Sequence, residues 1–347
     1  MQESFRLSAE FFRARGEEQE QLHSRAGAAT RAGFDRQVFL RAVVEVSNFC
    51  RENCSYCGMR RDNKTLHRFR AKLDQLSELI VRHRPSSVRD INIQTGEDPV
   101  AVREIVIPLV KTIRRETDLG VSVCLGTQNA ALYQELEAAG ATTYIIKFET
   151  ADSRLYEEMG APGTLKERIQ HIRMLAERGW NVSSGFIAGL PKQTLPMLVA
   201  NLELARKLPL AGCSVSPFIP GESTPLSGSP TGNIDLTLNC MALLRLMRPD
   251  WIIPAVSALN LAEPGSGYRR GLGAGANLVT INMTPSDLRD DYLLYKRDRF
   301  IMTEERILSA IKAEGLVPSR QSLAAFYAAR KGQAQVECQS TAEVTAA

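Results

Sequence analysis

The sequence lacks several features that would assign it to common classes of protein. No apolar run approaches the roughly 18 residues that a membrane-spanning helix needs. The N-terminus, Met1 to Phe5, carries an early acidic residue and no apolar segment, so we expect no signal peptide. The 43 basic and 39 acidic residues nearly balance, and no basic stripe alternates with aromatic residues. We therefore expect neither a nucleic-acid partner nor a membrane partner.

Cysteine and histidine are also scarce. Seven cysteines in 347 residues, three of them in one short stretch, do not form the pattern of a secreted disulfide framework. The four histidines are scattered along the chain. These observations predict a cytoplasmic protein, because a reducing compartment keeps thiols free and would also protect an oxygen-labile metal cluster.

The three clustered cysteines, Cys50, Cys54 and Cys57, form a C-x3-C-x2-C loop directly after an apolar, strand-like run at 39–46. Thiolates at this spacing suit three irons of a [4Fe-4S] cluster, because thiolate is the usual ligand of such clusters. One iron would then lack a protein ligand and could bind a small molecule. A zinc site normally has four ligands, often from paired C-x2-C units, and no second pair is present. A partial zinc site and a chance grouping of thiols are the alternatives.

Strand-like and helix-like stretches alternate through most of the chain. Eight stretches are predicted strands, at 40–47, 89–95, 119–125, 143–149, 181–187, 212–218, 252–258 and 276–282. This alternation indicates parallel strands with crossover helices, and eight strands predict an α/β fold of the (β/α)8 TIM-barrel type. We expect an N-terminal helical extension at 1–36 with a helix over 4–25, the barrel at 37–330, and a disordered tail at 331–347 that contains Cys338.

The cysteine loop, with Tyr56 directly before the third cysteine, resembles the signature of the radical S-adenosylmethionine (SAM) enzymes. The resemblance covers most of residues 38 to 305 and is greatest with the biotin-synthase-like branch, in particular with the [FeFe]-hydrogenase maturase HydE and more distantly with methylornithine synthase. It is carried by strings such as Gln94-Thr95-Gly96-Glu97-Asp98-Pro99 and Phe148-Glu149-Thr150-Ala151. It implies that SAM chelates the open iron, and that an electron from the cluster cleaves it to methionine and a 5'-deoxyadenosyl radical.

The resemblance also implies which residues bind SAM: Tyr56, Gly96, Glu97, Asp98, Glu149, Arg168 and Ile187. A glycine lets the backbone approach a ligand closely, a carboxylate binds ribose or ammonium groups, and a guanidinium binds a carboxylate through two hydrogen bonds. Without the cysteines, 96–99 would be interpreted as a simple turn and Arg168 as a solvated helix residue.

Polar residues on the predicted strands are candidates for contact with a substrate: Ser122, Lys147, Ser183, Ser257 and Asn282. Lys147 would offer a positive charge to an anionic group. Two further thiols, Cys124 and Cys213, either face the barrel lumen or act as small buried hydrophobes. The segment 289–298, after the last predicted strand, either covers the barrel mouth or forms a surface helix.

These features predict a radical SAM enzyme that acts on a small sulfur-containing or amino-acid-derived substrate in cofactor biosynthesis or maturation. A flavodoxin or ferredoxin would supply electrons. Sulfur insertion at unactivated carbons, as in lipoyl or biotin synthesis, is an alternative that requires a second iron-sulfur centre. Biotin synthase has such a [2Fe-2S] cluster, but Ser122 and Ser183 align with two of its cysteine ligands, and serine is a poor iron ligand. A non-catalytic iron-sulfur carrier with the same fold is the alternative from another class.

Overall fold

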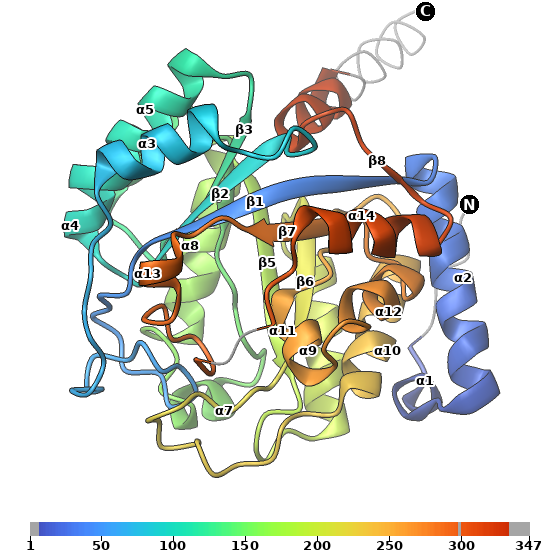
Figure 1. Ribbon diagram of the computed structural model, residues 1–347. Coiled ribbons are helices and arrows are strands. Elements are labelled where there is room, and N and C mark those ends of the chain that lie inside the picture. The colour runs from blue at the N-terminus through green and yellow to red at the C-terminus, as the bar shows by residue number, and fades with distance from the viewer. Residues whose placement is uncertain (1–6, 298–299, 333–347) are drawn as a thin grey trace, which may run out of the picture.

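The computed structural model describes residues 7–297 and 300–332, which form an eight-stranded sheet with helices packed against it (Figure 1). The strands are β1 (Gln37–Ser47), β2 (Asp90–Thr95), β3 (Gly120–Cys124), β4 (Thr143–Ile145), β5 (Asn181–Ala188), β6 (Gly212–Pro217), β7 (Leu278–Asn282) and β8 (Val317–Pro318). The helices are α1 (Ala9–Arg13), α2 (Gly16–Phe34), α3 (Leu73–Arg82), α4 (Pro99–Ala101), the π-helical turn η1 (Val102–Val106), α5 (Ile107–Glu116), α6 (Ala130–Ala139), α7 (Ser153–Glu158), α8 (Leu165–Glu177), α9 (Leu195–Lys207), α10 (Ile234–Met247), α11 (Ser257–Ala262), α12 (Gly267–Gly273), α13 (Ser286–Arg289) and α14 (Glu304–Ala313), with further helical residues at 323–332.

The strands pair in parallel in the order β6-β5-β4-β3-β2-β1-β7, and β8 pairs with β1. In Figure 1, α3 and α5 lie outside the sheet on one side, and α2, α10 and α12 lie toward the opposite end. Because parallel neighbours need a crossover, a helix follows most of the strands. The predicted parallel α/β fold is confirmed.

Side chains alternate between the two faces of each strand. On β1, Leu40, Ala42 and Val44 join the apolar core shared with the helices, so the intervening Arg41 and Glu45 face the other way. We call this other side of the sheet the inner face. The C-terminal helical residues Leu323 and Tyr327 pack against it at Phe39 and Leu278, near the N-terminal ends of β1 and β7. The polar members of the inner face include Arg41, Glu45, Asp90, Asn92, Gln94, Ser122, Cys124, Thr143, Lys147, Asn181, Ser183, Ser214, Ser216, Thr280 and Asn282.

The predicted strand at 252–258 is wrong. Ile252 forms an isolated bridge to Gly212 of β6, Pro254 forms another to Leu278 of β7, and α11 already begins at Ser257. Pro254 has no backbone N–H to donate, so it interrupts the hydrogen-bond ladder that a central strand requires. Two single bridges therefore link β6 to β7 where a full strand was expected.

The Asn277 side chain replaces part of the missing ladder. It accepts a hydrogen bond from the backbone N–H of Ile253 at 2.7 Å and donates to the carbonyl of Trp251 at 3.4 Å. In Asn277→Ala the buried Ile253 N–H loses its acceptor, so we expect the free energy of unfolding to fall by about 2 kcal/mol. Urea denaturation measures this change, with Gln134→Ala on the exposed side of α6 as the control. An Asn277→Ala protein as stable as that control would show that this side chain does not hold the segment.

The two ends of the chain differ from the prediction. The single helix expected over 4–25 is two helices, α1 and α2, and the second ends only where Asp35 adopts a left-handed φ of 47°. Phe12 of α1 is buried in the same apolar core as the strands, so the extension packs directly onto the sheet domain. Residues 331–332 continue a helix, and the rest of the predicted tail, with Cys338, lies outside the described residues. The division into three parts stays a prediction.

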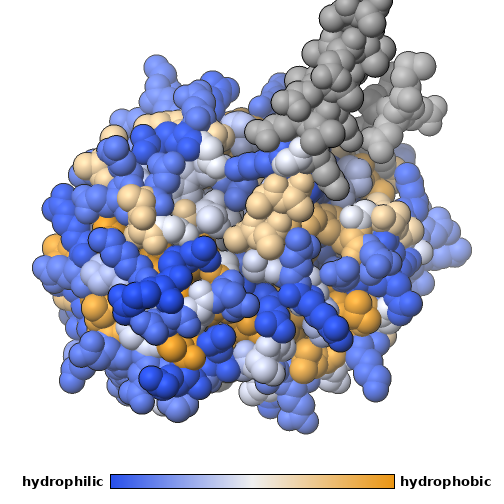
Figure 2. Space-filling view, turned by 90° about the horizontal axis from the view of Figure 1, so that it is seen from above, coloured by the Kyte–Doolittle hydropathy of each residue, from blue (hydrophilic) through white to orange (hydrophobic). Residues whose placement is uncertain are grey.

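The surface has few exposed apolar side chains. Figure 2 shows one face on which hydrophilic residues predominate and apolar ones form small patches. Among the described residues, Val100 and Val317 are the exposed large hydrophobic residues. Within the same ranges, no helix combines the length and the apolar character needed to cross a membrane.

Candidate functional site

The three clustered cysteines lie in an irregular loop between β1 and α3. Cys54 is buried and Cys50 and Cys57 are half-buried, all as free thiols. The backbone N–H of Glu97 donates to Cys50 Sγ at 3.4 Å. Burial raises the pKa of all three thiols, that of Cys57 to about 12, and the neighbouring thiols raise the pKa values of Cys54 and Cys57 further. Each thiol must therefore lose its proton when a metal binds.

The arrangement of these thiols suits a cluster. Among the described residues, no three His, Cys, Asp or Glu side chains are gathered tightly enough to hold one metal ion. A [4Fe-4S] cluster makes a different demand, because each thiolate binds its own iron. Three thiols presented by one loop, close enough to influence one another electrostatically, fit that demand.

Gly96 allows β2 to approach the cysteine loop. A Cβ at this position would lie 2.2 Å from the carbonyl oxygen of Phe49 and 2.8 Å from Cys50 Cβ. We expect Gly96→Ala to displace the loop and to lower the iron content of reconstituted protein by about half, because a backbone oxygen cannot yield as a flexible side chain can. Colorimetric iron analysis measures this loss. Gly228→Ala is the matched control, since no described residue other than its chain neighbours lies within 4 Å of its Cβ position. Equal iron content in both variants would contradict the prediction.

Glu97 is the centre of a buried network. Its carboxylate accepts hydrogen bonds from Arg168 Nη2 at 3.3 Å, Arg51 Nη2 at 3.2 Å, and the Thr127 backbone N–H at 2.9 Å. Arg168 is only 3% exposed, and it also donates to the hydroxyl of Tyr156 at 3.4 Å. The alternative interpretation of Arg168 as a solvated helix residue is therefore wrong. β2 and α8 bring these two predicted SAM-binding residues together.

Asp98 is engaged within the protein. Its buried carboxylate accepts from Ser47 Oγ at 2.7 Å and from Arg70 Nε at 2.7 Å. It also caps α4 by accepting from the backbone N–H of Ala101 at 3.3 Å. Through these contacts Asp98 stabilises the turn after β2. A contact between Asp98 and SAM stays a prediction.

Glu149 follows β4 with a strained backbone and an unsatisfied carboxylate oxygen. Its φ of 58° lies in the left-handed region that non-glycine residues rarely adopt, and such strain is common at functional sites. Oε2 is buried and makes no hydrogen bond in the described part of the chain, although Lys147 Nζ lies 3.9 Å away. The charge of this carboxylate raises the pKa values of Cys54 and Cys57. The backbone carbonyl of Glu149 accepts from the N–H of Ile187, whose side chain packs in one cluster with Tyr56 of the cysteine loop. A buried acceptor at this place suits a ligand that donates.

Tyr56 and Ile187 lie in one apolar cluster with Leu190 and Phe218. Both backbone groups of Ile187 are already paired: its N–H donates to the Glu149 carbonyl at 2.9 Å, and its carbonyl accepts from Gln193 Nε2 at 2.9 Å. A ligand at this end of β5 would therefore find the Ile187 N–H already engaged, and would meet the Ile187 side chain.

Four of the five candidate substrate residues, Ser122, Lys147, Ser183 and Asn282, lie on the inner face of the sheet. Lys147 Nζ donates to Ser216 Oγ at 3.0 Å, and Asn282 Nδ2 donates to Glu45 Oε1 at 3.3 Å. The fifth, Ser257, was expected on a strand, but it is an exposed residue at the start of α11.

Cys124 and Cys213 face opposite sides of the sheet. Cys124 is half-buried on the inner face at the end of β3, where burial raises its pKa to about 11. Cys213 of β6 is fully buried in the apolar core shared with the helices. The interpretation of Cys213 as a small buried hydrophobe is therefore confirmed, and the two thiols do not share a site.

The segment after β7 packs onto the cysteine loop. Tyr292 and Leu293 are buried in a cluster with Met59, Leu66 and Phe69. The backbone N–H of Gly58 donates to the carbonyl of Leu294 at 3.4 Å. The helix α13 has only 4 residues and ends at Arg289. The contact of residues 292–294 with the loop therefore favours a covering role for the segment over a surface helix. Asp298 lies outside the described residues.

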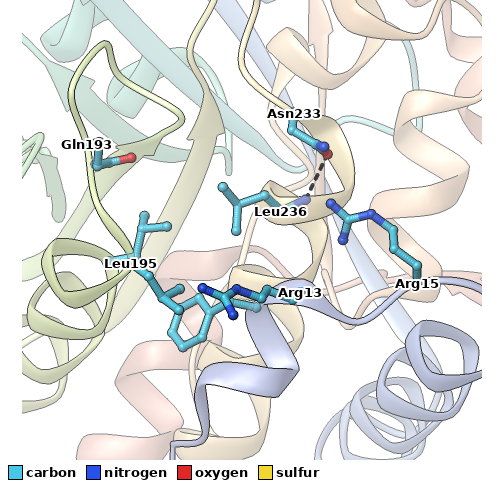
Figure 3. Close-up of a pocket in the computed structure, with 8 residues that line it drawn as sticks. Arg13, Arg15, Gln193, Leu195, Asn233 and Leu236 are labelled. Carbon is cyan, nitrogen blue, oxygen red and sulfur yellow. Dashed lines mark hydrogen bonds between the residues drawn. The ribbon is translucent and has the colours of Figure 1, made fainter.

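A separate surface pocket of about 340 Å³ lies between α1 and the N-terminal ends of α9 and α10 (Figure 3). It is lined by Phe12, Arg13, Arg15, Gln193, Leu195, Leu198, Asn233 and Leu236. Figure 3 shows the hydrogen bond from the Leu236 backbone N–H to Asn233 Oδ1, which caps α10 at its margin. None of the residues predicted to bind a cluster, SAM or substrate lines this pocket.

The sequence-based reasoning missed Arg51 and Thr127, which contact Glu97, and Arg68, which contacts the cysteine loop. Contacts between distant segments leave no local pattern, so Thr127 gave no signal. The alternation of Arg68 and Arg70 in an extended stretch soon after the cysteines is the signal that was available.

Comparisons with known proteins agree with this geometry. The family model described as the radical SAM superfamily matches residues 44–208. The chain is 35% identical over 259 residues to the [FeFe] hydrogenase maturase subunit HydE of Thermotoga maritima, covering 75% of this chain and 74% of that protein. It is 27% identical to 3-methylornithine synthase of Methanosarcina acetivorans, covering 92% and 93%. The crystal structure of methylornithine synthase (PylB) superposes with a TM-score of 0.81 at 24% identity, covering 91% of this chain and 95% of that one. This chain belongs to the radical SAM superfamily.

Proposed function

We propose that Cys50, Cys54 and Cys57 hold a [4Fe-4S] cluster and that SAM binds its open iron. When bound, the cluster and SAM together supply a 5'-deoxyadenosyl radical. The observation that carries the proposal is the buried Oε2 of Glu149, which accepts no hydrogen bond in the described part of the chain. Glu149 bonds through its backbone to Ile187, which packs in one cluster with Tyr56 of the three-cysteine loop. A hydroxyl or ammonium group of SAM would satisfy the Oε2 acceptor.

The other predicted SAM residues would bind different parts of the SAM molecule. Glu97 and Arg168, which are paired and buried, would orient the methionine moiety through charge. Tyr56 and Ile187 would enclose the adenosine in their apolar cluster. Gly96 would let the backbone after β2 approach the cofactor closely. The protein's part in the chemistry is then to orient SAM and to exclude water.

We propose that the substrate is a small sulfur-containing or amino-acid-derived molecule used in cofactor biosynthesis or maturation. Support comes from the 35% identity to a hydrogenase maturase and from the polar inner face. Lys147, whose Nζ lies 3.9 Å from Glu149 Oε2 and donates to Ser216, would bring its positive charge to a carboxylate or another anionic group on that face. The same proposal includes three further points. The eight strands close into a barrel through residues 252–254, a flavodoxin or ferredoxin donates electrons, and the protein is located in the cytoplasm.

Sulfur insertion is the second candidate, and it requires another iron-sulfur centre. The separation of Cys124 and Cys213 onto opposite faces of the sheet weighs against a pair of thiols that could hold one. Iron analysis of anaerobically reconstituted protein distinguishes the candidates, because one cluster contains about four irons and two contain about six to eight.

Anaerobic incubation with SAM and dithionite tests the proposed chemistry. We expect 5'-deoxyadenosine to form and to be detected by liquid chromatography. An intact cluster with no turnover would instead indicate a non-catalytic iron-sulfur carrier. Adding candidate amino acids and thiols should then increase the rate only for molecules that the inner face accepts.

A further inference from the structure

Arg68 holds both ends of the cysteine loop. Its guanidinium donates at 2.5 Å to the carbonyl of Asn48, a residue that precedes the first cysteine. It also donates to the carbonyls of Met59 at 2.9 Å and Arg60 at 2.7 Å, which follow the third cysteine. A fourth bond reaches the carbonyl of Asn63 at 3.3 Å. One planar group with several donors thus joins segments that have no ladder of backbone hydrogen bonds between them.

Two asparagine side chains support the same arrangement. Asn48 accepts from the backbone N–H of Phe69 at 2.8 Å and donates to the carbonyl of His67 at 2.7 Å. Asn63 donates to the carbonyl of Gly58 at 2.7 Å. Asn48 therefore holds residues 67–69 against the segment before the first cysteine, and Asn63 closes the turn after the third cysteine, to which Arg68 also donates.

The charge of Arg68 has no carboxylate partner among the described residues. In contrast, Arg51 pairs with Glu97 and Arg70 pairs with Asp98. The acceptors of Arg68 are neutral carbonyls, and the thiols of Cys50 and Cys57 are close enough to interact with its charge. A full positive charge thus remains uncompensated beside two of the proposed cluster ligands.

We infer that Arg68 is a positioning residue that holds the cysteine loop in its cluster-binding shape and raises the reduction potential of the bound cluster. The inference rests on the proposed function, because it requires a cluster at Cys50, Cys54 and Cys57. A nearby positive charge stabilises the reduced cluster, which carries one more negative charge than the oxidised one, and net charge and hydrogen bonding are known determinants of cluster potential. The cation would thereby make the cluster easier for a biological donor to reduce.

The test compares Arg68→Gln, which removes the charge, with Arg68→Lys, which keeps the charge and loses the planar array of donors. Amide hydrogen exchange before reconstitution measures how well the cysteine loop is held in place. We expect faster exchange over 48–63 in both variants than in the wild-type protein. A redox titration followed by electron paramagnetic resonance (EPR) measures the reduction potential of the bound cluster. We expect Arg68→Gln to lower the reduced-to-oxidised ratio at fixed potential about tenfold, which is 59 mV for one electron, and Arg68→Lys to stay near the wild-type value.

Arg115→Gln serves as the control, because Arg115 is 69% exposed and lies at the end of α5 that precedes β3, at the opposite end of the parallel sheet from the cysteine loop. Unchanged exchange over 48–63 together with an unchanged potential in Arg68→Gln would overturn the inference. If Arg68→Gln binds no cluster, faster exchange in its loop supports the positioning role, and wild-type exchange overturns it. A wild-type protein that binds no cluster would contradict the proposed function instead, so the two failures are distinguishable.

Discussion

Cys54→Ala should lose the bound cluster, and with it the reductive cleavage of SAM. Cys54 is 8% exposed and lies in the loop with Cys50 and Cys57, where the three thiols influence one another's charge. Removing one thiolate leaves an iron without a protein ligand. We expect iron to fall from about four atoms per chain to below about one. Formation of 5'-deoxyadenosine should fall by more than roughly a hundredfold, because even changes around the direct ligands of metal sites cost up to that factor.

Cys50→Ala and Cys57→Ala should behave in the same way, because the proposal gives each thiolate its own iron. Cys213→Ala is the matched control, since its thiol is buried in the apolar core on the other side of the sheet. We expect that control to retain about four irons per chain and wild-type turnover. A Cys54→Ala protein that keeps a complete cluster would refute the ligand assignment.

Glu97→Gln should destabilise the protein and weaken SAM binding. The carboxylate neutralises Arg168, whose side chain is only 4% exposed. It also forms an ion pair with the partly exposed Arg51 and accepts a hydrogen bond from the hydroxyl of Thr127. A neutral amide leaves the buried guanidinium without its counter-ion. Breaking a buried pair by removing one partner costs several kcal/mol, so we expect the free energy of unfolding to fall by about 3 kcal/mol. We also expect at least about tenfold weaker SAM binding, equivalent to 1.4 kcal/mol.

Urea denaturation and equilibrium dialysis with labelled SAM measure these two changes. Glu158→Gln is the control, because Glu158 forms surface ion pairs with Arg154 and Lys192, and such pairs contribute about 1 kcal/mol or less. Equal stability of the two variants would show that the Glu97 network does not support the fold. Unchanged SAM binding by a folded Glu97→Gln protein would remove Glu97 from the proposed cofactor site.

The features that the sequence predicted well are those with a local or periodic signal. The alternation of strand-like and helix-like stretches predicted the parallel sheet. The position of the cysteines after an apolar run predicted that the candidate ligands follow the first strand, β1. The predictions failed where a single residue overrides the pattern. Pro254 interrupts an apolar run that otherwise favours a strand, and so Ser257 begins α11 instead of facing the sheet interior.

Pairing between distant segments was beyond sequence reasoning. Nothing in the sequence around Glu97 indicates that Arg168, 71 positions away, is buried against it. Asp98 likewise resembles a ligand residue in sequence, whereas Ser47 and Arg70 occupy its carboxylate. Cys124 and Cys213 both lie on strands, and only the register of β3 and β6 assigns them to opposite faces.

EPR spectroscopy of the reduced cluster with and without SAM tests the central claim most directly. If one iron is free of protein ligands, SAM carrying a ¹⁵N label in its amino group should change the spectrum of the reduced protein and show a magnetic coupling between that nitrogen and the cluster. A spectrum that stays the same at saturating SAM, or a fourth protein side chain bound to the cluster, would contradict the account.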